Sequence, residues 1–195
     1  MIIINEGLPE KFKSSAAELF LDALGEKFIP ILGKDDRAKQ LIESSIEVSS
    51  CVSAEEDGKL LGVLAIQTMD GSFFNPSLKE LIFSYGLFRA IAKAINLSML
   101  KHNTKVSELY VEAVAVTEFA RGKGIGTKLF DSMIKFAKNK GYSHITLQVI
   151  DTNPRAKELY KRIGFSVIKK SRMWPFNKLV GWPFDEVFLM KKSIF

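Results

Sequence analysis

The sequence predicts an α/β protein whose mixed sheet is flanked by helices, and two patterns support this prediction. In the first, alternating segments at about 109–116 and 145–150 enclose an amphipathic helical segment, an order that makes the two strands parallel. In the second, alternating segments at about 49–56 and 59–69 meet at a turn that ends in Gly58, which favours an antiparallel hairpin. A sheet that contains both kinds of pairing is mixed.

Other segments extend this pattern along the chain. Residues 1–6 form too short an apolar run for a signal peptide or a membrane span and are expected to be the first strand. Residues 9–47 are predicted as two helices joined by an apolar bend at 28–32, where a proline disfavours a continuous helix. Two late strands are expected at about 165–172 and 185–191.

The loop Arg121-Gly-Lys-Gly-Ile-Gly126 predicts an anion site. Its glycines lie between a strand and the start of a helix, where backbone N–H groups have no intrahelical partners. The helix dipole and the charges of Arg121, Lys123 and Lys128 favour a pyrophosphate. The loop differs from the dinucleotide fingerprint because Thr127 replaces its last glycine, and from the Walker loop because Lys123 precedes a glycine. A tight turn without a ligand is the plain alternative.

Two amphipathic helices are predicted in this half of the chain. The first begins at Ile125, and Gly141 is placed to end it. The second is capped by Thr152 or Asn153, has a proline at its first position, and ends at Gly164. Their apolar stripes are Ile125, Leu129, Met133, Phe136 and Ala137 in the first helix, and Ala156, Leu159, Tyr160 and Ile163 in the second.

In the order strand, glycine loop, helix, strand, Asn-Pro helix and Gly-Phe, residues 107–170 resemble the GNAT superfamily of acyl-CoA-dependent N-acetyltransferases. The matching residues are Arg121, Gly124, Gly126, Asn153, Ala156, Tyr160, Gly164 and Phe165. The resemblance implies a mostly antiparallel mixed sheet of about seven strands with helices on both faces. It also implies a helical insertion at about 70–103, between strands 3 and 4, within a single domain over residues 1–195.

The resemblance further implies an enzyme that moves an acetyl group from acetyl-CoA, its cosubstrate, to a primary amine by direct attack in a ternary complex. The backbone of Val114 and Val116 would bond the pantetheine arm, the 121–126 loop would hold the pyrophosphate, and Asn153 would touch the arm. A non-catalytic CoA-binding or regulatory module is the alternative. The residues implied to bind the cofactor are Val114, Ala115, Val116, Arg121, Gly122, Lys123, Gly124, Ile125, Gly126, Thr127, Asn153, Ala156 and Tyr160.

Acetyl transfer to an amine needs an oxyanion donor, an acid for the thiolate and a base for the amine. A backbone N–H near Val116 and the Tyr160 hydroxyl are expected to fill the first two roles. Glu112, expected on the same face of its strand as Val114, is the candidate base, with Glu108 or a water as alternatives. Taken alone, Tyr160 could be a core aromatic residue and Glu112 a solvent-facing acid.

Composition is consistent with a soluble enzyme, since 47% of the 195 residues are hydrophobic and 26% are charged. The single Cys51 excludes an internal disulfide and indicates a reducing, cytoplasmic setting. With His102 and His144 it makes no metal-ligand set, so no metal is expected. The net charge of +6 is spread out and suits an anionic cofactor better than a nucleic acid.

Two further segments could shape the acceptor site. In the segment 70–103, a helical apolar stripe suggests a lid or simple core packing, with a dimer surface or a membrane-bound basic helix as alternatives; a membrane partner is not expected. The stiff aromatic segment 173–184 could line an amine pocket or pack on that helix. A protein N-terminus, lysine, aminoglycoside, polyamine or amino acid are all open as acceptors. The predicted stripe consists of Phe88, Ile91, Ala92, Ile95 and Met99.

Overall fold

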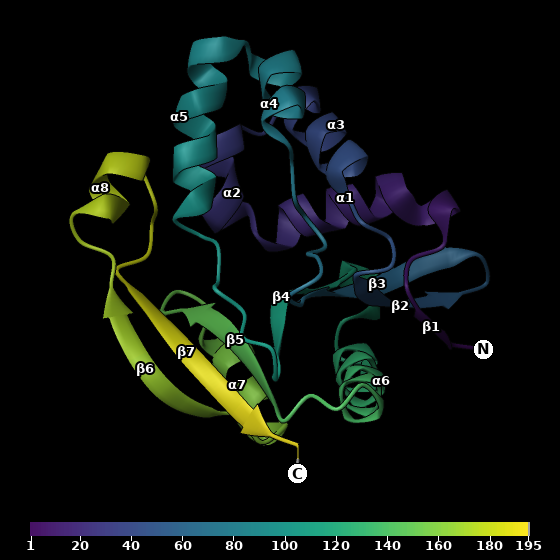
Figure 1. Ribbon diagram of the computed structural model, residues 1–195. Coiled ribbons are helices and arrows are strands. Elements are labelled where there is room, and N and C mark those ends of the chain that lie inside the picture. The colour runs from purple at the N-terminus through teal and green to yellow at the C-terminus, as the bar shows by residue number, and fades with distance from the viewer. Residues whose placement is uncertain (195) are drawn as a thin grey trace.

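The structure is a computed structural model and describes residues 1–194. Within these residues, seven strands form one sheet in the order β1-β2-β3-β4-β5-β7-β6, in which β4 and β5 pair parallel and the other neighbours pair antiparallel (Figure 1). The predicted mixed, mostly antiparallel sheet is therefore confirmed. The strands are β1 (Ile3–Glu6), β2 (Cys51–Glu56), β3 (Lys59–Gln67), β4 (Glu108–Val116), β5 (His144–Ile150), β6 (Ser166–Arg172) and β7 (Glu186–Ser193).

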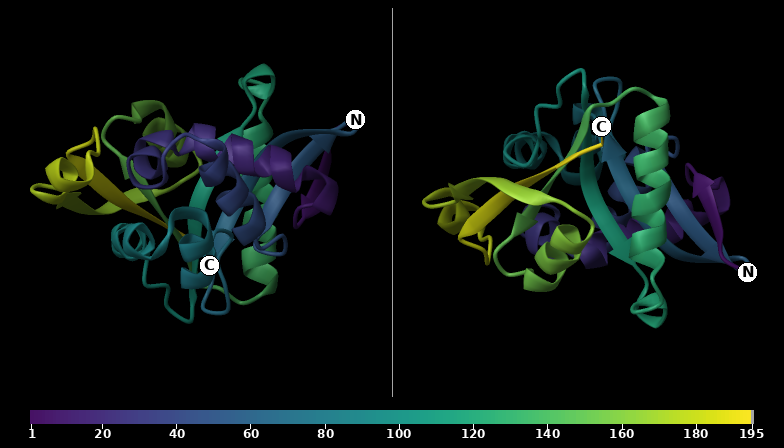
Figure 2. Two further views of the ribbon diagram at one scale, coloured as in Figure 1. Left: turned by 90° about the horizontal axis from the view of Figure 1, so that it is seen from above. Right: turned by 90° about the horizontal axis from the view of Figure 1, so that it is seen from below.

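Helices cover both faces of this sheet, as predicted. Helices α1 to α5 lie on one face, and α6 lies along the other, as the view from below in Figure 2 shows. No helix within residues 1–194 is long and apolar enough to cross a membrane. The helices are α1 (Lys13–Ala23), α2 (Gly25–Leu32), α3 (Asp36–Ser45), α4 (Leu78–Tyr85), α5 (Leu87–Ser98), α6 (Ile125–Asn139), α7 (Pro154–Arg162) and α8 (Phe176–Val180), with 3-10 turns at Glu10–Phe12 and Glu118–Ala120.

The two faces of the sheet carry separate hydrophobic cores. One core packs α1 to α5 and the segment around Phe73 against strand residues such as Ala113. The other packs α6 through Leu129, Phe130 and Met133 against Leu109 and its strand neighbours. The alternation predicted for the strands follows from this arrangement, because each strand sends successive side chains into opposite cores.

The N-terminal helical region differs from the prediction of two helices joined by a bend at 28–32. The structure has three helices, and the predicted bend lies inside α2, with Pro30 in the body of that helix. The helical path is interrupted instead at Leu24 and at Gly33, whose φ of 93° suits glycine. Pro30 is tolerated because α2 is only eight residues long and its apolar residues Phe28 and Ile31 are buried.

A bulge in β4 determines which side chains reach each face. Ala65 of β3 pairs with Ala113, whereas Ile66 pairs with Val111, so Glu112 is the extra residue. The extra residue reverses the alternation, and Glu112 faces the side of α1 to α5 while Val114 packs toward α6. The prediction that Glu112 shares a face with Val114 and Val116 is therefore wrong, because a strand pattern read from sequence assumes no bulge.

Strands β4 and β5 pair over only part of their length. Their ladder joins residues 108–111 to residues 144–147 and ends there, although β5 continues alongside β7 to Ile150. Beyond Val111, β4 remains paired with β3 alone. The sheet therefore opens between β4 and β5, its parallel pair of strands.

Candidate active site

The glycine loop has the backbone conformation expected for an anion-binding turn. Gly122 and Gly124 have φ values of 78° and 76°, in the left-handed region that glycine adopts without strain. A Cβ added at either position would meet no atom within 4 Å, so the space around this backbone is open. Gly124 is also the N-cap of α6, and the Arg121 and Lys123 side chains are exposed beside it. These features suit a pyrophosphate.

The backbone of β4 faces the opening in the sheet. The Thr117 N–H donates to the Leu61 carbonyl of β3 at 2.9 Å. Because alternate residues of a strand point their amides in opposite directions, the N–H groups of Val116 and Val114 point away from β3, toward the gap. The Arg121 side chain donates to the Val116 carbonyl at 3.3 Å, which ties the loop to this strand. The gap thus exposes backbone donors of the kind predicted to meet a pantetheine arm.

Asn153 caps α7, as predicted. Its side-chain oxygen accepts a hydrogen bond from the Ala156 N–H at 3.0 Å, and Pro154 occupies the first turn. The exposed amide nitrogen of Asn153 makes no hydrogen bond within residues 1–194. Between α6 and α7 lies a cleft of about 620 Å³ that is lined in part by Thr127 and Leu159.

Tyr160 is half-buried on α7 and packs on the core of α6. Its ring meets Phe130 edge to face at 5.7 Å between centroids, and burial raises the pKa of its phenol to about 12. Burial, then the charge of Glu112, then Tyr160 itself raise the pKa of Tyr110 on β4. With its pKa of about 12, the Tyr160 phenol is a proton donor at neutral pH.

On the other face of the sheet, a cleft of about 860 Å³ opens beside Glu112. The Glu112 carboxylate accepts hydrogen bonds from the Ser72 hydroxyl at 2.7 Å and from the Phe73 N–H at 2.9 Å. Burial nevertheless raises the pKa of Glu112 to about 7. A carboxylate with this pKa is suited to accept a proton near neutral pH. The cleft is also lined by Lys27, Phe28, Leu97, His102, Tyr110, Gln148 and Phe184, among others.

Comparison with known proteins identifies the family to which this chain belongs. The sequence profile of the acetyltransferase (GNAT) family matches residues 17–165. The chain belongs to the GNAT family. The predicted resemblance is thus confirmed, and membership agrees with the prediction of an acetyltransferase. The β4–β5 opening and the glycine loop lie within the matched range, whereas the cleft beside Glu112 also includes later residues such as Phe184.

Curated relatives match the GNAT chain over part of their length. Thialysine N-epsilon-acetyltransferase of Bos taurus is 36% identical over 77 residues, which cover 40% of this chain and 45% of that protein. N-alpha-acetyltransferase 30 of Schizosaccharomyces pombe is 34% identical over 68 residues, which cover 35% and 45%. The chain therefore spans less than half the length of these relatives.

Among solved structures, the ribosomal-protein-S18-alanine N-acetyltransferase from Escherichia coli aligns with a TM-score of 0.62 at 15% identity. That alignment covers 100% of this chain and 94% of the other. Another structure, described as an acetyltransferase, aligns with a TM-score of 0.64 at 20% identity and covers 99% and 100%. At these identities the likeness concerns the fold alone.

The GNAT chain has a second acid on β4, Glu108, which was the alternative base. Although burial alone would raise the pKa of Glu108, hydrogen bonds from Thr146, the Lys105 N–H and His102 more than offset this effect and lower it. The His102 ring lies 2.9 Å from the Glu108 carboxylate and stacks on Tyr110 at 4.2 Å. Glu108 is therefore held as a paired anion, whereas Glu112 lines the open cleft.

Sequence reasoning missed Lys27 and His102 as cleft residues. Lys27 lies on α2, and burial lowers the pKa of its ammonium to about 8. No carboxylate within residues 1–194 forms an ion pair with it. Neither residue belongs to a motif, and both reach the cleft only because α2 and the loop before β4 fold over the same part of the sheet. No local sequence signal could have identified them.

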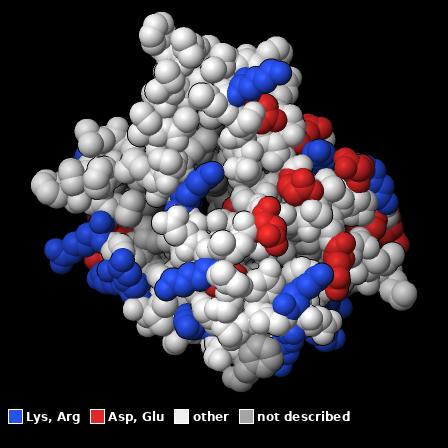
Figure 3. Space-filling view, viewed as in Figure 1, with Lys and Arg blue, Asp and Glu red and all other residues white. Residues whose placement is uncertain are grey.

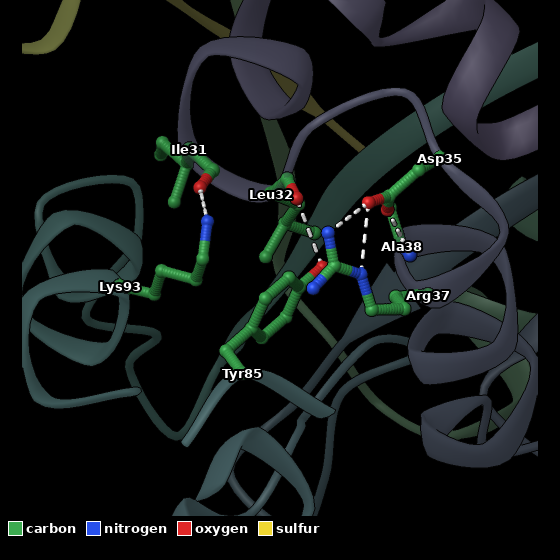
Figure 4. Close-up of polar contacts among 7 residues, drawn as sticks. All are labelled: Ile31, Leu32, Asp35, Arg37, Ala38, Tyr85 and Lys93. Atoms are coloured by element: carbon green, nitrogen blue, oxygen red, sulfur yellow. Dashed lines mark hydrogen bonds and ion pairs between the residues drawn. The ribbon is translucent and has the colours of Figure 1, made fainter. Parts of the chain in front are cut away.

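The helical insertion, α4 and α5, forms one wall of the cleft. Tyr85 donates to the Leu32 carbonyl at 2.9 Å, and the Lys93 ammonium donates to the Ile31 carbonyl, so the insertion is fixed to the C-terminal end of α2 (Figure 4). The helical insertion is thus present between β3 and β4 as predicted, and Met99 of the predicted stripe lines the cleft, but the rest of that stripe does not form the inner face. Leu81, Ala94 and Leu97 face the cleft instead, while most of the predicted stripe is exposed. The exposed members of that stripe are Phe88, Ile91, Ala92 and Ile95.

Proposed function

We propose that the protein transfers an acetyl group from acetyl-CoA to a primary amine by direct attack within a ternary complex. The observation that supports this best is the arrangement of β4. Within about ten residues it leads from Glu112 in the acceptor cleft, past the opened gap, to the loop at 121–126. One strand thus connects a base, exposed backbone donors and an anion site, which are the parts that aminolysis of a bound thioester requires.

The residues of the chain would act in a defined order. Glu112 accepts a proton from the acceptor ammonium, directly or through water, and the neutral amine attacks the thioester carbonyl. A backbone N–H of Val116 or Val114 stabilises the developing oxyanion. As the tetrahedral intermediate collapses, the C–S bond breaks and Tyr160 gives its phenolic proton to the departing thiolate. The extra proton on the attacking nitrogen leaves through water, which returns a proton to Tyr160. The pKa of about 12 keeps the Tyr160 phenol protonated at neutral pH, so that its proton is present when the thiolate departs.

The 121–126 loop would hold the pyrophosphate of the cosubstrate, with Arg121 and Lys123 as counter-charges. The open space over Gly122 and Gly124 supports this assignment, since a phosphate needs close access to backbone N–H groups. Asn153 would donate from its amide nitrogen to the arm. The buried, free Cys51 supports a cytoplasmic setting for the enzyme.

Two measurements together test the proposal. The first is release of CoA thiol from acetyl-CoA across a panel of amines, and the second is thermal or chemical unfolding with CoA alone. CoA at about a hundred times its dissociation constant should stabilise the fold by about 2.7 kcal/mol. Stabilisation without thiol release on any amine would instead support a non-catalytic CoA-binding module. Absence of both would refute the proposal.

A further inference from the structure

The helical insertion and the segment that contains α8 expose several large apolar side chains. Phe83 is 94% exposed, Phe88 86%, Leu179 78% and Trp174 74%. Helices α5 and α8 lie on the same side of the molecule in the views of Figures 1 and 2. We name this region the outer surface, and it consists of Phe83, Leu87, Phe88, Ile91, Ile95, Trp174, Phe176 and Leu179.

A small movement of α5 would not bury these side chains. The opposite side of α5 is already packed, because Ala90 and Leu97 belong to the core and Lys93 is bonded to α2. The Lys93 ammonium also lies 4.3 Å from the centroid of the Tyr85 ring (Figure 4). The insertion is therefore anchored with its apolar outer side held toward solvent. Large exposed apolar patches of this kind mark sites of interaction.

The charge of the segments that carry the outer surface indicates what kind of partner this surface binds. The segments 81–107 and 166–184, which carry the outer surface, each contain four Lys or Arg and no Asp or Glu. Their eight positive charges exceed the net charge of the whole chain, +6, so the rest of the chain has 20 basic and 22 acidic residues and a net charge of −2. Figure 3 shows most acidic side chains of this face gathered on the side of α1 and α3, away from α5 and α8. Of these eight bases, Lys93 is bonded to α2 and Lys170 is paired with Glu186. The positive charge beside the apolar surface therefore comes from exposed bases such as Arg89 and Lys178.

We infer that the outer surface docks on an anionic lipid membrane. Phe83, Phe88, Trp174 and Leu179 would enter the headgroup region, and exposed bases such as Arg89 would meet lipid phosphates. A second copy of the chain fits this surface less well, because two identical basic borders would then face each other. The sequence favoured a lid or core packing over a membrane helix, and the exposure of the stripe reverses that preference.

Docking of the outer surface on a membrane would also affect the acceptor site. The cleft beside Glu112 is lined by the inner side of the same insertion, through Leu81 and Leu97, and by Met173 at the start of the α8 segment. A membrane bound to the outer surface would therefore lie against the elements that enclose the acceptor site. The inference itself is independent of the proposed function, since it concerns binding rather than transfer.

The two tryptophans provide a direct test. Trp174 is exposed, whereas Trp182 is 4% exposed and donates to the Lys27 carbonyl. Vesicles of phosphatidylcholine with phosphatidylglycerol should shift the fluorescence of the protein to the blue and carry the protein with them on sedimentation. Vesicles of phosphatidylcholine alone should do so weakly. Trp174→Phe should abolish the shift without abolishing sedimentation.

Matched variants separate the apolar and the charged parts of the surface. Phe88→Glu should weaken vesicle binding about tenfold or more, whereas Val106→Glu, also at an exposed apolar residue but outside the outer surface, should have a much smaller effect. Arg89→Gln with Lys178→Gln should weaken binding about fivefold for each charge removed. The same change at Lys135 of α6 and at Lys140, the C-cap of that helix, should weaken binding far less.

Three results would overturn the inference. The first is failure to sediment with anionic vesicles at low salt. The second is equal loss of binding in the outer-surface and the α6 charge variants. The third is a stable dimer in analytical ultracentrifugation that Phe88→Glu converts to monomers. Acetyl transfer to a soluble amine is measured in parallel, and its presence or absence bears only on the proposed function.

Discussion

At the scale of single residues, Glu112 gives the most specific prediction, which concerns the pH dependence of kcat/KM. Its pKa of about 7 means that kcat/KM should rise with pH through this value as the carboxylate loses its proton. In Glu112→Gln the amide can still bond Ser72 and the Phe73 N–H, but it cannot accept a proton. We expect kcat/KM to fall about 10²–10⁴-fold and this limb of the pH profile to disappear. A limb that persists near pH 7 in the variant would exclude Glu112 as the base.

The same substitution should lower kcat/KM but raise the stability of the fold. A loss of activity can therefore be distinguished from a loss of folding. The pKa of Glu112 is raised from 4.5 in the unfolded chain to about 7, so the folded state binds the proton more tightly. The resulting stability is fully present below about 4.5 and is lost as pH rises through about 7. Because Gln resembles the neutral acid, Glu112→Gln should be more stable than the wild type at pH 8, by up to about 3 kcal/mol. Urea unfolding at pH 8 and pH 4.5 measures the difference, which should vanish at the lower pH.

For Lys27, the pH dependence of stability should have the opposite sign. Burial lowers its pKa from 10.5 to about 8, so between these values the unfolded chain binds more protons and stability rises with pH. Lys27→Met removes the cost of burying the ammonium and should increase the free energy of unfolding at pH 7 by about 1–3 kcal/mol. The gain should shrink at pH 10. An equal gain at both pH values would mean that packing, not charge, explains it.

Lys27 also offers a way to sort acceptors. A buried ammonium without a carboxylate partner would be neutralised by an acceptor that carries its own carboxylate. Paired amines that differ only in a free or amidated carboxylate are therefore informative in the thiol-release assay. Lys27→Met should raise KM for the free acids and leave the amides unchanged. Equal effects on both members of each pair would argue against carboxylate recognition.

At the scale of elements, a substitution in the glycine loop can distinguish effects on the stability of the fold from effects on CoA binding. Gly126 lies inside α6 with an ordinary φ, and a Cβ there would be 3.8 Å from Leu159, a normal contact. Gly126→Ala should therefore stabilise the fold by about 0.5–1 kcal/mol, because alanine favours a helix. If a pyrophosphate packs on the loop, the added methyl group should weaken CoA binding about tenfold or more in calorimetry, a loss of 1.4 kcal/mol or more. Lys135→Ala, on the same helix, should leave the affinity unchanged.

How far the elements could be predicted depends on whether their signals are local. The first helix after the loop begins at Ile125 as expected, and Asp57 and Gly58 form the predicted hairpin turn with φ values of 49° and 72°. In these cases the residues that determine the structure are neighbours in sequence. The bulge at Glu112 has no such signal, because it arises from the register between β3 and β4. The exposed stripe of α5 shows the same limit, since periodicity identifies an apolar face but not what covers it.

At the scale of the whole molecule, the site depends on contacts between distant segments. The anion loop, the α7 cap and Tyr160 all lie within residues 121–160, and the family resemblance could therefore assign them residue by residue. The cleft beside Glu112 instead gathers α2, Ser72, His102, β4 and Phe184 from across the chain. Their meeting place is set by sheet order and by the packing of the insertion on α2. Such a site becomes visible only in three dimensions.

The opened sheet predicts a pattern of hydrogen exchange for the whole chain. The N–H groups of Val114 and Val116 point toward the gap, where the β4–β5 ladder has ended, so they should exchange faster than that of Ala115, which points to β3. CoA should slow the exchange at Val114 and Val116 by bonding to this edge, and it should also protect the 121–126 loop. Strands β1 and β2, at the far edge of the sheet, should serve as an internal control with unchanged rates. Protection confined to the loop would show that the cosubstrate does not enter the gap, and the assignment of Val116 as an oxyanion donor would then be wrong.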